Sequence, residues 1–290
     1  MFHNRRQLGG LRHPSSGAAV YQGIGDVTSA VLYLGLRAYT LAQLTAGTTP
    51  AVQITGQFAG THVDFFPKAS NGGFVDSADV QTYLTANGGG FAYTRQVYDL
   101  TGGGAGVGNT LLDTTNPRYN LSGVSASVGT VDFVSSNVQR LSNNSSPLTR
   151  AQPFTIAAVA KHTTTNSGTL YSNGAWAMQY KDTAVNQVSI YAGAAKIHAT
   201  ANDGTFNSVI IVVNGSSSKV VVNDGTPANS TAIGTAGSTS GDILNVGQFG
   251  SSLDFFDGSF CEFAIIAGAA SAGTITALYQ NQRTAYGNIF

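Results

Sequence analysis

Short runs of apolar and β-branched residues, separated by turn-forming residues, recur along most of the chain. The clearest pair spans residues 209–213 and 219–222, with Asn-Gly between the two runs and Asn-Asp-Gly after the second. Such runs are too short and too branched to favour helices, and Asn-Gly tolerates the positive φ of a tight turn. The pattern predicts a buried β-hairpin over residues 206–225.

The same pattern predicts further strands on both sides of this hairpin. Each is an apolar or alternating run bounded by Gly, Asn, Ser or Pro. The expected strands span residues 50–54, 62–66, 91–99, 128–133, 154–161, 169–172, 176–180, 188–193, 243–247 and 260–266. Many short strands at near-even spacing are typical of a two-sheet sandwich.

Two segments carry helical patterns instead. Residues 76–84 place two aspartates in a first turn, where the helix dipole favours negative charge. Residues 274–283 place three side chains on one helical face: Ile275, Leu278 and Gln282. Residues 36–44 fit a strand or a helix, and the pattern does not separate the two. The sequence therefore predicts an all-β domain closed by a short C-terminal helix.

Composition agrees with a β-rich chain. There are 36 glycines, and strong helix formers such as Glu and Lys are scarce. Charged residues make up 10% of the chain, against roughly 25% in ordinary soluble domains, and the net charge is zero. We therefore expect no nucleic-acid partner and no attraction to anionic membranes. A sparsely charged surface suits packing into an assembly or contact with uncharged polymers such as polysaccharides.

The N-terminal sequence bears on where the protein is made. Basic residues in the first seven positions have no apolar segment after them, so we expect no secretory signal. Residues 18–36 are too interrupted by polar residues and glycine for a membrane span. Cys261 is the only cysteine and lies in an expected strand, which favours a buried, inert thiol. We expect synthesis and folding in a reducing cytoplasm, without membrane insertion.

Residues 1–25 read as an extended N-terminal arm, followed by one sandwich domain over residues 26–290. Arg5, Arg6 and Arg12 meet no acidic residue before Asp26, and Gly, Pro and Ser interrupt any regular element. A disordered terminus and an internal groove are alternatives. We favour an anchor that binds a neighbouring protein chain, because arginine pairs well with acidic grooves.

The order of these elements resembles known families. The hairpin resembles concanavalin A-like sandwich domains of the laminin-G type, with Phe206 where Trp is usual. Residues 36–121 resemble the first half of the α-L-arabinofuranosidase B catalytic domain, a concanavalin A-like fold also seen in phage proteins. The matching landmarks are residues 35–41, 73–76, 92–104 and 116–119. The resemblance spans most of residues 30–287 and implies a concanavalin A-like two-sheet jelly-roll sandwich.

This resemblance also implies where catalytic carboxyl groups would lie. Glycosidases use two, one as acid and one as nucleophile or base. By the family's spacing, Asp182 takes the place of the nucleophilic Glu that follows a Trp-x-Met strand. The place of the acid falls at Gln248 and Phe249, and neither side chain can donate a proton to a leaving group. Asp254 and Asp257 are nearby alternatives.

Other chemistry is weakly supported. The glycine-rich residues 102–108 lack the Lys-Ser/Thr pair of a phosphate-binding loop, and the five histidines have no ligand spacing. The Asn-Asp-Gly sequences at 202–204 and 223–225 could supply oxygens to calcium, but hairpin turns are the favoured interpretation. We therefore predict no catalytic residue, no metal and no cofactor.

These observations lead to a functional hypothesis. The broken acid pair, low charge and basic arm indicate a non-enzymatic structural protein of a bacteriophage virion, in capsid decoration or in a tail fibre. Its expected partners are other virion proteins, including copies of itself, and a host surface polysaccharide. The candidate carbohydrate-binding residues are Trp176, Tyr180, Asp182, Gln248 and Phe249. The alternative is a carbohydrate-active enzyme, an arabinofuranosidase-like glycoside hydrolase.

Overall fold

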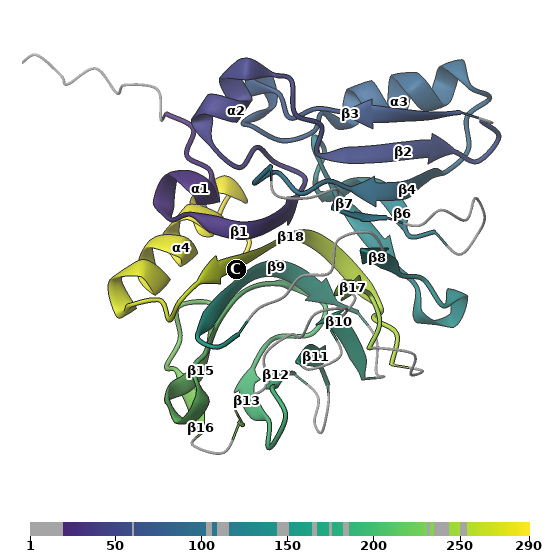
Figure 1. Cartoon of the computed structure of the whole chain (residues 1–290). Coiled ribbons are helices and arrows are strands. Elements are labelled where there is room, and N and C mark those ends of the chain that lie inside the picture. The colour runs from purple at the N-terminus through teal and green to yellow at the C-terminus, as the bar shows by residue number, and fades with distance from the viewer. Residues whose placement is uncertain are drawn as a thin grey trace, which may run out of the picture.

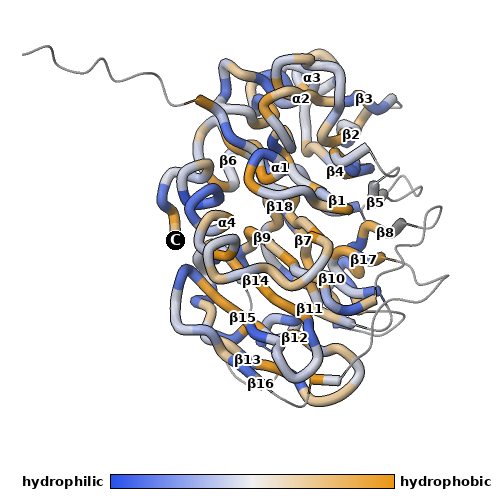
Figure 2. The backbone as a smooth tube through the Cα atoms, turned by 60° about the vertical axis from the view of Figure 1, so that its left-hand side comes forward, coloured by the Kyte–Doolittle hydropathy of each residue, from blue (hydrophilic) through white to orange (hydrophobic). Residues whose placement is uncertain are grey.

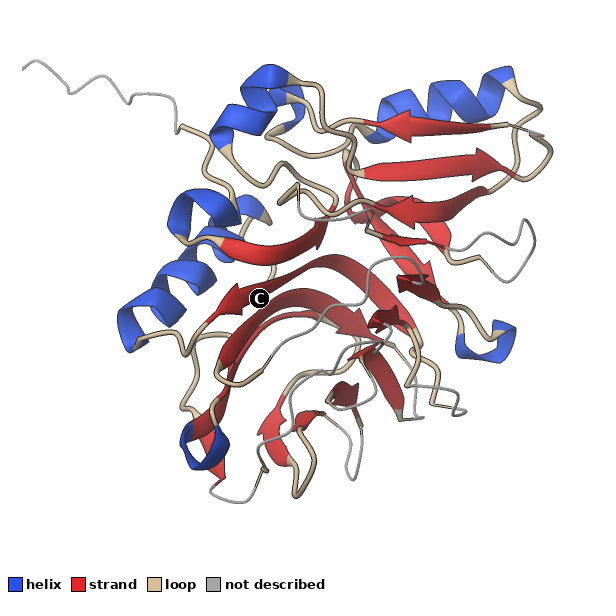
Figure 3. Ribbon diagram, in the orientation of Figure 1, coloured by secondary structure: helices blue, strands red, loops and turns tan. Residues whose placement is uncertain are grey.

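Strands dominate the described part of the computed structural model, and four α-helices in that part lie at its margins (Figure 3). The described residues are 20–59, 61–102, 106–108, 116–143, 151–163, 167–173, 176–181, 186–230, 233–234, 244–249 and 254–290. The predicted arginine contacts of the arm, at Arg5, Arg6 and Arg12, lie outside them. The all-β sandwich with a short C-terminal helix is confirmed.

One layer of the sandwich, here called the β18 sheet, is antiparallel throughout. It contains the predicted hairpin as β14 and β15, whose residues Val209 and Val222 pair directly. Its strands, in spatial order, are β16 (Ala228–Ser230), β15 (Ser218–Val222), β14 (Phe206–Val213), β9 (Phe154–His162), β18 (Gly258–Ala267) and β1 (Ala30–Gly35). The 3-10 turn η3 (Gly215–Ser217) joins the two strands of the hairpin.

The second layer, the β11 sheet, lies under the curved β9 and β18 strands (Figure 1). Its strands, in spatial order, are β13 (Ile197–Thr200), β12 (Gln187–Tyr191), β11 (Ala177–Tyr180), β10 (Gly168–Ser172), β17 (Leu244–Val246), β8 (Leu141–Asn143) and β5 (Val107–Gly108). Neighbouring strands are again antiparallel. Successive side chains along a strand point to opposite faces, except at the irregularity between Thr169 and Tyr171 in β10.

A smaller group of strands connects the two layers. It contains β3 (His62–Phe65), β2 (Val52–Gly56), β4 (Ala92–Val97), β6 (Arg118–Ser125) and β7 (Val128–Phe133). Strand β4 also pairs with β5, and β7 pairs with the start of β18. Hydrogen-bonded ladders therefore run without interruption from the β11 sheet through this small sheet to the β18 sheet.

The helices cover edges and outer faces. They are α1 (Ile24–Val27), α2 (Leu41–Ala46), α3 (Ser77–Ala86) and α4 (Ala272–Ala285), with 3-10 turns η1 (Ala69–Asn71) and η2 (Ser135–Asn137). Helix α3 begins after Asp76, whose side chain accepts from Ala78 N, as its sequence predicts. Helix α4 buries Ile275, Leu278 and Gln282, the predicted face. Residues 36–44, which were ambiguous, contribute to α2.

Aromatic rings fill the space between the two layers. The Tyr171 and Phe263 rings stack with centroids 3.5 Å apart, and Trp176 packs on Phe154 at 5.5 Å. Figure 2 shows the matching hydrophobic stretches along the central strands. Cys261 is buried in β18, and burial raises the pKa of its thiol well above the usual value, which agrees with the predicted inert thiol.

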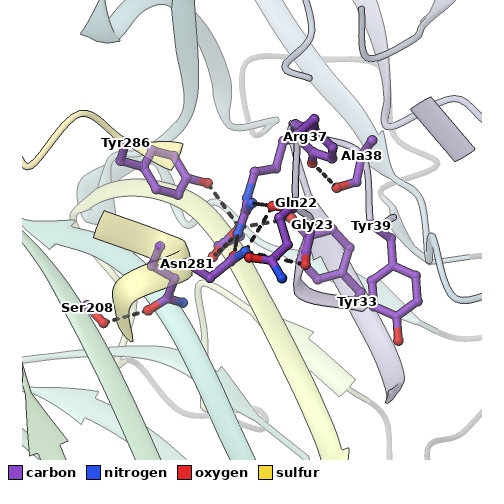
Figure 4. A network of polar contacts seen from close by, with 12 residues as sticks. Gln22, Gly23, Tyr33, Arg37, Ala38, Tyr39, Ser208, Asn281 and Tyr286 are labelled. Atoms are coloured by element: carbon purple, nitrogen blue, oxygen red, sulfur yellow. Dashed lines mark hydrogen bonds and ion pairs between the residues drawn. The ribbon is translucent and has the colours of Figure 1, made fainter. Parts of the chain in front are cut away.

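A buried ion pair joins Arg37 to Glu262, which precedes Phe263 in β18 and so projects from the opposite face of the strand. Figure 4 shows the polar contacts around Arg37. Arg37 Nε donates to Glu262 Oε2 at 2.6 Å, and both side chains are fully buried. Tyr33 OH donates to the same oxygen at 2.9 Å, and Tyr286 OH lies 3.3 Å from it. Burial, reinforced by the Glu262 charge, raises the pKa of both tyrosines well above the usual value, so both hydroxyls stay protonated donors.

The same network holds the first residues before α1. Arg37 Nη1 donates to Gln22 O at 3.2 Å, and Asn281 Nδ2 donates to that oxygen at 2.9 Å. Ile24 is fully buried. The backbone of Gln22 and the side chain of Ile24 are therefore held by the folded domain, although the sequence placed the whole of 1–25 in an arm.

Breaking the ion pair should cost much of the protein's stability. Glu262→Gln leaves the Arg37 charge buried without a counter-charge, which should lower the free energy of unfolding by about 3–5 kcal/mol. Lys68→Met, which removes the half-exposed Lys68–Asp79 pair, should cost about 1 kcal/mol or less. Urea unfolding of both variants measures the difference, and equal losses would contradict it.

Truncation should locate the start of the core. Removing residues 1–25 deletes the Gln22 carbonyl and the Ile24 side chain, so the melting temperature should fall clearly. Removing residues 1–19 keeps every contact named for Gln22 and Ile24 and serves as the matched control. Calorimetry on the two truncated proteins tests this, and an unchanged melting temperature in the longer deletion would show that these contacts are dispensable.

Candidate functional site

The outward face of the β11 sheet is polar, whereas its inner face is aromatic. Met178 and Tyr180 are directed to the core, so Gln179 between them lies on the opposite face. Gln179 pairs with Thr169 on one side and with Ser189 on the other, and Ser189 pairs with His198. Directly paired residues project on the same side of a sheet. These four residues therefore form one line across four strands, here called the first polar row.

The row continues towards β17 through a short bridge. Phe255 pairs with both Thr169 and Gln248, which brings Gln248 beside the end of the row. Arg140 Nη1 donates to Gln248 Oε1 at 2.8 Å, and Gln179 Nε2 donates to Thr169 Oγ1 at 3.2 Å. Phe255 thus separates Thr169 from an amide–guanidinium pair, Gln248 and Arg140, at the end of the row.

Two atoms of this row have unused hydrogen-bonding capacity. Within the described part of the chain, Ser189 Oγ and His198 Nδ1 are buried without a hydrogen-bond partner. Buried polar atoms are nearly always paired, so each such atom calls for an explanation. A ligand with hydroxyl groups would satisfy both atoms.

The predicted carbohydrate-binding residues separate into two groups. Trp176 is fully buried between Phe154 and Phe263, and Tyr180 is also a core residue, so neither ring offers a face to a ligand in this structure. Gln248 joins the first polar row, and Phe249 lies half-buried beside it. Asp182 lies outside the described residues. The carbohydrate role of Asp182, Gln248 and Phe249 stays a prediction.

The carboxyl groups weighed in the sequence lie in different surroundings. Glu262, the only glutamate, is held in the ion pair with Arg37 on the far side of β18. Asp257 accepts from Ser135 Oγ at 3.0 Å. Asp254 is half-buried and directly precedes Phe255, and its carbonyl oxygen accepts from Thr169 N at 3.4 Å. Of these three, Asp254 is the one whose backbone joins the first polar row.

A charged cluster that the sequence did not reveal lies at the end of β9. His162 Nδ1 is 3.3 Å from Asp203 Oδ1, and Lys181 Nζ is 3.1 Å from Asp203 Oδ2. The His162 ring stacks on Tyr180, with centroids 5.5 Å apart. Burial lowers the pKa of His162, although the Asp203 charge opposes this. Asp203 thus connects its own turn to the segments that carry His162 and Lys181. From the sequence, its Asn-Asp-Gly motif predicted only a turn.

Two other expectations concern loops and metals. Gly106 has a φ of 84°, and a Cβ there would come within 2.1 Å of Val97 O, so the glycine serves close backbone contact. Strand β5 follows it directly, where a phosphate-binding loop would need a helix. No group of three or more His, Cys, Asp or Glu among the described residues is arranged to hold a metal. No helix in that part is long and apolar enough to cross a membrane.

Comparison with known proteins identifies the fold. No family model matches the chain, and no curated protein matches its sequence. A GH54 α-L-arabinofuranosidase soaked with a cyclic sulfate inhibitor gives a TM-score of 0.69 at 12% identity, over 91% of this chain and 66% of that chain. An arabinofuranosidase complexed with arabinofuranosyl-α-1,2-xylobiose gives 0.63 at 14%, over 91% and 65%. The chain thus shares their β-sandwich and spans about two thirds of their length.

These similarities correct one expectation from the sequence. A non-enzymatic protein was expected, because Gln248 and Phe249 occupy the place of the family's acid. The solved structures that share the fold at TM-scores of 0.63–0.69 are glycoside hydrolases, so that expectation is overturned. At 12–14% identity the likeness establishes the fold.

The buried histidine should make stability depend on pH. Because the pKa of His162 is lowered in the folded protein, the unfolded chain binds its proton first as pH falls. The stability present above about pH 6.5 should therefore be lost as pH falls through the folded-state pKa. His162→Gln should reduce this loss, whereas His62→Gln, at an exposed position, should not. Urea midpoints from pH 7.5 to 5 measure the three slopes, and identical slopes would refute the assignment.

Proposed function

We propose that the chain is a carbohydrate-active enzyme, an arabinofuranosidase-like glycoside hydrolase. The observation that carries the proposal is the sandwich shared with arabinofuranosidases over 91% of this chain. One of those enzymes is complexed with an arabinofuranosyl-xylobiose, and another is soaked with 4-nitrophenyl α-L-arabinofuranoside. The substrate class proposed for this chain is therefore an α-L-arabinofuranoside. The first polar row, whose Thr169, Gln179 and Ser189 are buried, is proposed as the polar layer beneath its binding site.

Hydrolysis requires two carboxyl groups beside the scissile bond. Asp182 follows β11 by two residues, at the position that the family resemblance gives to the nucleophile. Strands β11 and β17 both run antiparallel to β10, which lies between them. Their carboxyl ends therefore lie at the same end of the sheet. Gln248 follows β17 at that end of the sheet, but an amide cannot act as the acid. Gln248 pairs with Phe255, and Asp254 directly precedes Phe255 in the chain. We assign Asp182 as nucleophile and Asp254 as acid.

The expectations about biological context are separate from this activity. We propose that the fold is concanavalin A-like and that the protein functions on a phage particle, where such sandwiches also occur. Attachment through the N-terminal arm, contacts with other virion proteins and self-association are predictions of the same kind. A hydrolase on a particle surface would act on a host polysaccharide, which joins the two hypotheses.

Catalysis can be measured with 4-nitrophenyl α-L-arabinofuranoside and with arabinoxylan. Asp182→Asn and Asp254→Asn should each lower kcat by about 10²–10⁴-fold, the range for loss of an acid, base or nucleophile. Asp257→Asn is the matched control, because its carboxylate is bound by Ser135 rather than placed at the row. Normal activity in both variants, or no turnover by the wild type on either substrate, would overturn the proposal.

A further inference from the structure

A second line of polar residues runs beside the first and is much longer. It starts on the β11 sheet and crosses onto the small sheet, because β5 pairs with both β8 and β4. Each residue of the line is the direct register partner of the next. In order, the line consists of Tyr191, Ala177, Ser172, Asn245, Ser142, Gly108, Gln96, Gln53 and Asp64. We call it the second polar row.

Register places all these positions on one face of a continuous ladder. Trp176 and Met178 flank Ala177 in the chain and are core residues, so this face is the one directed away from the β18 sheet. Seven of the nine residues are polar, and the other two are alanine and glycine. No bulky apolar side chain interrupts the row.

The row divides into a covered half and an accessible half. Ser172 is fully buried and Asn245 nearly so, whereas Ser142, Gln96, Gln53 and Asp64 are partly exposed. The accessible half spans four strand spacings, roughly 19 Å at about 4.8 Å per strand. That length exceeds a single sugar ring and suits an extended chain lying across the strands.

The chemistry of the accessible half selects a neutral, hydroxyl-rich ligand. Gln53 Nε2 donates to Asp64 Oδ1 at 2.9 Å, and Tyr98 OH donates to the same oxygen at 2.8 Å. The single carboxylate of the row is thus already bound by two donors. Ser142 Oγ donates to Asn245 Oδ1 at 2.7 Å. Amides and hydroxyls both donate and accept, which matches sugar hydroxyls better than phosphates or peptide charges.

We propose that the second polar row, from Ser142 to Asp64, is a distal binding surface for an extended neutral polysaccharide. This deepens the proposed function, because the surface adjoins the first polar row and would hold a polymer whose branch is cleaved there. Two facts support this occupant over a protein partner. The chain has few charged residues and no net charge, and the row is continuous with the candidate site.

The test removes the two amides at the centre of the accessible half. Gln53→Ala combined with Gln96→Ala should weaken arabinoxylan binding about tenfold, the loss expected for two hydrogen-bonding amides. The KM for arabinoxylan should rise far more than the KM for 4-nitrophenyl α-L-arabinofuranoside, which is too short to reach the row. Gln81→Ala is the control, because it removes an exposed amide from α3 on the same small sheet.

The outcomes separate the two proposals. Binding is measured by affinity electrophoresis with arabinoxylan, arabinan and dextran, and oligomeric state by sedimentation. Wild-type protein that binds polymer without hydrolysing either substrate would sink the proposed hydrolase and leave the binding surface standing. Hydrolysis by a double variant that binds all polymers normally would overturn the surface alone. Absence of polymer binding by the wild type, or a wild-type oligomer that the double variant dissociates, would also overturn it.

Discussion

The ion pair between Arg37 and Glu262 is the constraint on which the outer half of this fold depends. It joins the segment after β1 to β18, and Asn281 and the Gln22 carbonyl extend it to α4 and to the residues before α1. Two charges fully removed from water are tolerable only if every remaining donor and acceptor is bound. The tyrosines that donate to Glu262 meet this requirement, so several elements distant in sequence must dock together for the pair to form.

This use of the only glutamate has a chemical consequence. The Glu262 carboxylate is buried, is bound by a guanidinium and two phenols, and lies on the opposite side of β18 from the polar rows. A pair of carboxyl groups on the β11 sheet would therefore have to come from aspartates. Aspartate is one methylene shorter than glutamate, so the backbone that carries it has to come closer to the substrate. The bridge that Phe255 makes to Thr169 and Gln248 places the backbone of Asp254 beside the first polar row.

Sequence pattern predicts the parts of this fold that are locally determined. The β14–β15 hairpin, α3 and α4 each carry their own turn, cap or periodic face, and all three lie where the pattern places them. Strand β6 was missed because Asn, Ser and Gly interrupt it, and pairing with β7 stabilises it instead. The core position of Trp176 and the His162–Asp203 cluster depend on contacts between segments that are distant in sequence. The pairing of such segments cannot be deduced from the pattern of a single sequence.

The polar rows show the same limit most directly. Alternation in residues 177–180 already separates Gln179 from the core-facing Met178 and Tyr180. It does not reveal that Thr169, Ser189 and His198 stand beside Gln179, or that Gln53 and Gln96 continue a neighbouring line from a different sheet. A sandwich core needs only one face of each strand to be apolar, so the other face is free to be selected for binding. Here the second row lacks bulky apolar side chains from β11 to β3. Burial alone does not require this distribution, whereas the proposed contact with a hydroxyl-rich polymer would account for it.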